Sequence, residues 1–190
     1  MFLSRLDLWL GKTILRLIGV PGSLQDKMGI CDEVEAILYG PDGKVKMRTV
    51  THDLVTDVGD TYCAGKVAGE SPTAAAGMKL GTAITAAAKS GAGSFITTGD
   101  YISGSAQAWD ATYPKSGAGA EDNVTIFMVT FAAGEGTSTT INEVAICSNT
   151  TDAGEADATG TYARSVFANT IPKGADDTLA VTAKWTHLGA

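Results

Sequence analysis

From Glu33 onward, apolar side chains recur at every second residue in short runs, and turn-forming residues separate these runs. The clearest run is NVTIFMVTF at residues 123–131, which is rich in β-branched and aromatic side chains. A period of two places alternate side chains on opposite faces of an extended chain, so the pattern predicts strands. Short strands joined by turn-rich loops are typical of mainly β proteins, and we expect a β-sandwich or jelly-roll-like domain.

Other segments predict the remaining elements of this domain. The stretch EVEAILYGPDGKVKMRTV predicts a hairpin with strands near 33–39 and 44–50, because proline presets the turn and glycine accepts a positive φ. One helix is expected within 57–69, with one side formed by Val58, Tyr62, Cys63 and Val67. Further strands are expected at 78–82, 95–98, 139–148, 161–170 and 178–188.

The first twenty residues follow a helical spacing instead. Apolar residues recur there at every third or fourth position, and this predicts an amphipathic helix whose partner-docking face is formed by Leu3, Leu6, Trp9, Leu10, Ile14 and Leu17. About 14 helical residues span about 21 Å, short of the ~30 Å hydrocarbon core of a bilayer. Charged residues also interrupt the run, so we expect neither a membrane span nor a secretory signal. The alternative to docking on a partner is packing on the chain's own domain.

These patterns divide the chain into three expected parts: a docking helix at 1–20, a β-hairpin connector at 21–56 and a β-sandwich domain at 57–190. The net charge is −7, and residues 51–190 hold seven Lys and Arg against fifteen Asp and Glu. Because nucleic-acid affinity relies on Lys and Arg that neutralise phosphates, we expect no nucleic-acid binding by this acidic part.

No motif predicts a cofactor, a metal ion or a catalytic centre. The sequence KSGAG occurs at 89–93 and 115–119, but in a phosphate-binding loop the lysine follows the glycines and a helix comes next, so both copies are predicted to be loops. No zinc or calcium motif occurs, and neither histidine accompanies a nucleophile motif. The widely spaced cysteines are expected to be buried, reduced thiols: Cys31, Cys63 and Cys147.

Four stretches after Thr51 carry turn-and-strand motifs in a fixed order: HDLVTDVG, MKLGTAITAAAKSGAG, VTFAAGEGTSTTINEVAIC and YARSVFANTIPKGADDTLAVTAKWTHLGA. Together they resemble a family of small tail-fibre-type structural proteins of tailed bacteriophages. The resemblance implies a non-enzymatic virion protein, made in the host cytoplasm, that assembles with itself, as a trimer for example, and with other virion proteins. A tail-associated fibre or fibre adaptor is favoured, and a capsid decoration or head-fibre protein is the alternative.

Two groups of residues are candidates for a functional role. Glu143 and Arg164 lie in expected strands and predict an ion pair, either between strands of one chain or between subunits. The loop-rich stretch DYISGSAQAWDATYPKSGAG contains Tyr101, Trp109 and Tyr113. Large aromatic side chains of this kind anchor a core or an interface, and recognition of a host surface glycan is the alternative.

An enzyme is the competing hypothesis. A small polysaccharide depolymerase in the virion would carry two carboxylates at a separation that the fold sets, and a sequence alone does not give that separation. A glycan-binding module without catalysis is the remaining alternative. The absence of any catalytic motif favours the structural, non-enzymatic interpretation.

Overall fold

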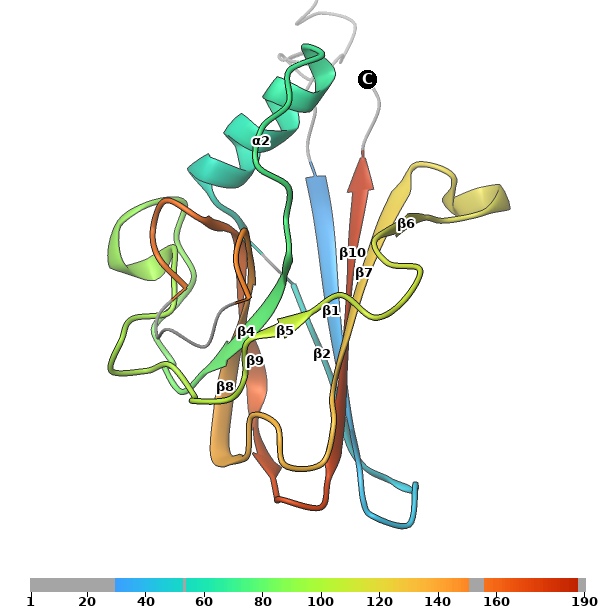
Figure 1. The fold of residues 1–190 in the computed structure, drawn as a ribbon, viewed down its shortest axis with the longest axis vertical. Helices are drawn as coiled ribbons and strands as arrows, with labels where there is room; N and C mark the ends of the chain where they lie inside the picture. The colour runs from blue at the N-terminus through green and yellow to red at the C-terminus, as the bar shows by residue number, and fades with distance from the viewer. Residues whose placement is uncertain (1–29, 53, 151–155, 188–190) are drawn as a thin grey trace, which may run out of the picture. The chain divides into compact units, whose positions relative to one another are not determined.

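Two antiparallel sheets face each other across a shared core (Figure 1). The computed structural model describes residues 30–52, 54–150 and 156–187. The first sheet has the order β2-β1-β10-β7-β6, with β1 (Ile30–Tyr39), β2 (Val45–Thr51), β6 (Lys115–Ser116), β7 (Val124–Phe131) and β10 (Thr178–His187). The second has the order β3-β9-β8-β4-β5, with β3 (Leu54–Val55), β4 (Gly77–Gly81), β5 (Gln107–Ala108), β8 (Ser138–Cys147) and β9 (Thr161–Lys173). The predicted mainly β, sandwich-like class is confirmed.

The first sheet follows the alternation that the sequence predicts. Along β1, Val34, Ala36 and Leu38 are buried, and the residues between them face outward and are partly exposed. Their partners on β10 are also buried, since Val34 pairs with Ala183 and Leu38 pairs with Leu179. Each fully buried Val or Leu contributes about 1.5–3 kcal/mol, so this inner face is a main source of stability.

The second sheet is covered on both faces. All five residues of β4 are buried, and a second apolar cluster of Ile96, Ala145, Cys147 and Ala156 packs on the side away from the shared core. The segment 82–106 supplies part of this cover. Its expected strand at 95–98 is wrong: the segment has a 3₁₀ turn at Gly91–Gly93 and one isolated bridge between Ile96 and Ala156. Ile96 packs in the apolar cluster and Thr97 Oγ1 donates to Asp100 Oδ2 at 2.6 Å, so these residues do not extend a ladder.

On each side of the sandwich, a segment of the chain passes from one sheet to the other. On one side β2 continues into β3, and Thr51 Oγ1 donates to the carbonyl of Val166 at 3.0 Å. On the other side β5 pairs with β4, β6 pairs with β7, and Asp110 between them accepts from Thr130 N at 2.9 Å. Unpaired strand edges attract other chains, so these crossings limit edge-to-edge association.

The expected boundary between a hairpin connector and the sandwich is wrong. Strand β1 pairs with β10 through ten successive residues, and the compact unit runs from Ile30 to His187. The hairpin is therefore part of the first sheet. The predicted docking face lies outside the described residues: Leu3, Leu6, Trp9, Leu10, Ile14 and Leu17. None of the described helices is long and apolar enough to cross a membrane.

Helix α2 (Asp57–Val67) confirms the helix expected at 57–69. Its N-cap is Thr56, whose Oγ1 accepts from Gly59 N at 3.1 Å and also donates to the carbonyl of Thr161 at 2.6 Å. The same residue therefore caps the helix and fixes it to β9. Val58, Tyr62 and Cys63 pack against the core, but Val67, expected on the same side, is 78% exposed.

Substitution of Gly59 tests whether α2 packs closely on β9. A Cβ at Gly59 would lie 2.1 Å from the carbonyl oxygen of Tyr162, which belongs to the backbone of β9. Although alanine in a helix is intrinsically better than glycine by about 1 kcal/mol, we expect Gly59→Ala to lower the free energy of unfolding by about 2 kcal/mol through overpacking. Urea denaturation measures the change.

Gly99→Ala is the matched control, because a Cβ at Gly99 meets nothing within 4 Å. We expect its stability to stay within about 0.5 kcal/mol of the parent. Equal effects of the two substitutions would contradict close packing of α2 on β9.

Candidate functional site

The predicted residues Glu143 and Arg164 form an ion pair within one chain. Arg164 Nε lies 2.6 Å from Glu143 Oε2, and the two side chains are 1% and 0% exposed. The pair joins β8 to β9 on the covered outer side of the second sheet. Arg164 Nη1 donates to the carbonyl of Gly93 at 3.0 Å, and Glu143 Oε1 accepts from Ala83 N at 2.9 Å. Both charges therefore also hold the segment 82–106.

The neighbouring strand β4 leaves space for this pair. A Cβ on Gly81, which lies opposite Glu143 in the register, would stand 2.3 Å from Glu143 Oε1. Burial raises the pKa of Glu143, and the Arg164 guanidinium and the Ala83 amide oppose that rise. Lys79, also buried, places its Nζ 5.5 Å from the centre of the Tyr101 ring. These charged side chains therefore lie between the second sheet and the segment 82–106, and each of them contacts a partner.

Removing one member of the buried pair should be strongly destabilising. In Arg164→Met the Glu143 carboxylate stays buried without its cation, and we expect a loss of about 3–5 kcal/mol in the free energy of unfolding. Arg48→Met is the control, because Arg48 pairs with Glu35 while its side chain is 65% exposed. That substitution should cost less than about 1 kcal/mol. Urea denaturation compares them, and similar losses would refute the structural role of the buried pair.

A second charged contact fixes the turn between β9 and β10. Asp177 Oδ2 accepts from Gly174 N at 2.9 Å and from Lys46 Nζ at 2.9 Å, so it joins this turn to β2. Lys173 is buried, and its Nζ donates to the carbonyl of Ala132 at 2.8 Å. The Lys46 ammonium, followed by the Gly174 amide, lowers the pKa of Asp177 below its ordinary value.

The lowered pKa gives a pH dependence with a definite sign. The contact stabilises the fold above the ordinary pKa of an aspartate, and this stabilisation is lost as the pH falls through the lower pKa of the folded state. We expect Asp177→Asn to flatten the decline of the melting temperature as the pH falls below about 4, the ordinary pKa of an aspartate. Asp176→Asn in the same turn is the control and should keep the parent's decline. An unchanged profile for Asp177→Asn would contradict the assignment.

The three predicted recognition aromatics lie in different environments. Trp109 donates from Nε1 to the carbonyl of Ala75 at 2.9 Å and packs on Phe127, with ring centres 5.2 Å apart. Tyr101 packs on the outer cluster of the second sheet. Tyr113 lies beneath Lys115, whose Nζ is 4.5 Å from the ring centre. Anchoring therefore describes Trp109 and Tyr101 better than recognition does.

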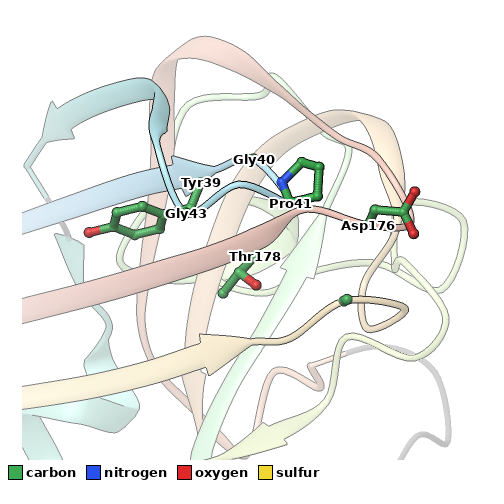
Figure 2. A pocket seen from close by; sticks show the side chains of 7 residues that line it. Tyr39, Gly40, Pro41, Gly43, Asp176 and Thr178 are labelled. Atoms are coloured by element: carbon green, nitrogen blue, oxygen red, sulfur yellow. The ribbon is translucent and has the colours of Figure 1, made fainter.

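The described residues form a cleft beside the β1–β2 turn and another beside α2, and these two elements lie at opposite ends of the sandwich in Figure 1. The first, of about 590 Å³, lies where the β1–β2 turn meets the turn before β10. Figure 2 shows that the Tyr39 ring and the Asp176 carboxylate point away from each other, so its polar groups do not converge. The second cleft, of about 550 Å³, lies between α2 and the start of β9 and combines tyrosines, carboxylates and hydroxyls.

The remaining candidate residues show no shared site. His52 and His187 are exposed, and His187 Nε2 lies 2.9 Å from Thr125 Oγ1. Cys63 is half-buried and Cys147 is buried, which raises the pKa of the Cys147 thiol to about 11, whereas the Cys31 side chain lies outside the description. Among the described residues, no group of three His, Cys, Asp or Glu is placed to hold a metal ion.

The two KSGAG copies differ in structure. The copy at 89–93 is a loop ending in the 3₁₀ turn, and Lys89 Nζ lies 2.6 Å from Asp60 Oδ2. In the copy at 115–119, Lys115 and Ser116 form β6, so the loop prediction is wrong for those two residues. The sequence of β6 does not predict its pairing with β7, because β6 has only two residues.

Comparison of the chain with known protein families, curated proteins and solved structures finds no match. The sequence pointed to Glu143 and Arg164 but gave no signal for the buried Lys79 or for the cleft beside Tyr62. Both depend on which strands become neighbours, and alternation along one strand does not carry that information.

Proposed function

We propose that this chain is a non-enzymatic structural subunit of a bacteriophage virion, with a tail-associated fibre or fibre adaptor as its favoured position. One observation carries the proposal: the charged and polar residues within the motifs that resemble phage tail-fibre-type proteins are used as scaffold. Thr56 caps α2, Glu143 pairs with Arg164, and Asp177 fixes the turn before β10. Polar residues committed to holding strands and loops together support a structural role.

We further propose that the outer face of the first sheet contacts a second copy of the chain. The outward residues Ile37, Ile126 and Met128 are only partly buried, although the solvent side of such a sheet is usually polar. Two pairs of opposite charge on this face lie within the chain, Arg48 with Glu35 and Lys184 with Glu121. An identical face therefore meets limited like-charge repulsion, and burial at roughly 25 cal/mol per Å² of apolar area favours docking.

Purified phage particles test the assigned function. Mass spectrometry of intact, washed particles should detect the chain, and labelled antibodies against it should mark the tail. Labelling of the capsid would support the alternative, a head-fibre or capsid decoration protein. Particles without this chain would refute the virion assignment.

Native mass spectrometry of the purified full-length chain tests assembly. We expect an oligomer, with Ile37→Asp shifting it toward monomer because a carboxylate then enters the apolar face. Ile84→Asp is the matched control, since Ile84 is 79% exposed in a loop, and it should leave the oligomer unchanged. Deletion of residues 1–20 tests the predicted docking helix separately. A monomeric parent chain would contradict self-assembly.

A further inference from the structure

The cleft at the α2 end is built by a close approach of helix and strand. Thr56 fixes the first turn of α2 to the backbone of β9 through the carbonyls of Thr161 and Tyr162. Gly59 lets the helix lie directly against Tyr162. One turn later Tyr62 therefore reaches the Tyr162 ring, with ring centres 4.9 Å apart. The position of Tyr62 thus follows from the cap and the glycine.

The aromatic wall of this cleft is held in place. Tyr162 is 4% exposed, and its hydroxyl donates to the carbonyl of Thr73 at 2.7 Å. Tyr62 is half-buried and lines the cleft together with Pro72. The Tyr62 ring and the Pro72 pyrrolidine provide apolar surface next to the fixed Tyr162 ring. A ligand that packs there therefore does not have to order these side chains.

The polar side of the cleft is also ordered. Asp157 Oδ1 accepts from Thr159 N at 2.7 Å and from Thr159 Oγ1 at 2.5 Å. Asp57 from the first turn of α2 and the hydroxyl of Ser148 complete a set of hydrogen-bonding groups. Among the residues that the structure describes, those lining the cleft include carboxylates and hydroxyls but neither Lys nor Arg. Such a lining disfavours anions and offers acceptors for ligand hydroxyls.

We propose that this cleft binds a neutral saccharide, a function that goes beyond assembly and does not depend on it. The apolar C–H groups of a sugar pack against Tyr62 and Pro72, and its hydroxyls donate to Asp57 and Asp157. A cationic ligand fits less well, because Lys66 Nζ already lies 5.6 Å from the centre of the Tyr62 ring. The site differs from the stretch containing Tyr101, Trp109 and Tyr113.

A glycan array probed with the full-length chain tests the proposal. The array should present neutral oligosaccharides of glucose, galactose, mannose and N-acetylglucosamine beside sialylated ones. We expect binding to neutral members only. For the best of them, calorimetric titration should show that Tyr62→Ala weakens affinity by about tenfold or more, while Tyr62→Phe stays within about twofold because the ring remains.

Two further variants keep the test independent of folding. Asp57→Asn changes an exposed carboxylate and should weaken binding at least about fivefold, since a charged acceptor bonds more strongly than an amide. Ile84→Ala removes an exposed apolar side chain from a loop outside the cleft and should leave affinity unchanged. Absence of binding to every neutral glycan, preference for sialylated glycans, or equal affinity of the Tyr62→Ala and Asp57→Asn variants and the parent would each overturn the proposal.

Discussion

The buried pair of Glu143 and Arg164 sets the architecture of the second sheet. A carboxylate and a guanidinium without solvent need partners in fixed directions, because an unpartnered buried charge costs several kcal/mol. Here β8 and β9 bring the charges together, and Gly93 and Ala83 supply the remaining hydrogen bonds. The segment 82–106 has little regular structure of its own, so these bonds and the contacts of Ile96 determine where it lies.

The two sheets consequently differ in how far their outer faces are covered. The second sheet is covered by segments of its own chain, whereas the first keeps an outward face with partly exposed apolar side chains. Crossing segments occupy both sides of the sandwich, and they disfavour association through strand edges. The α2 end carries the cleft that is lined by polar and aromatic residues. The proposed assembly and the proposed ligand binding therefore involve separate surfaces.

The sequence motifs behind the proposed function have structural roles in this fold. These motifs contain Thr56, Glu143, Arg164 and Asp177, each of which makes a hydrogen bond or ion pair between distant segments. Residues with such roles specify how the chain folds. The residues proposed to contact a ligand lie at other positions. Tyr62 follows the first motif along the chain, and its place in the cleft depends on the helix that this motif begins.

The sequence by itself determined the elements whose cause is local. Alternation gave β1, β7 and β10, the Gly40–Gly43 turn gave the hairpin, and the position of α2 was expected within a few residues. Tertiary structure decided the membership of that hairpin in the first sheet, the isolated bridge at Ile96 and the pairing that makes the cleft beside Tyr62. A period of two reports burial of one face, so it is lost in β4, where both faces are covered by segments remote in sequence.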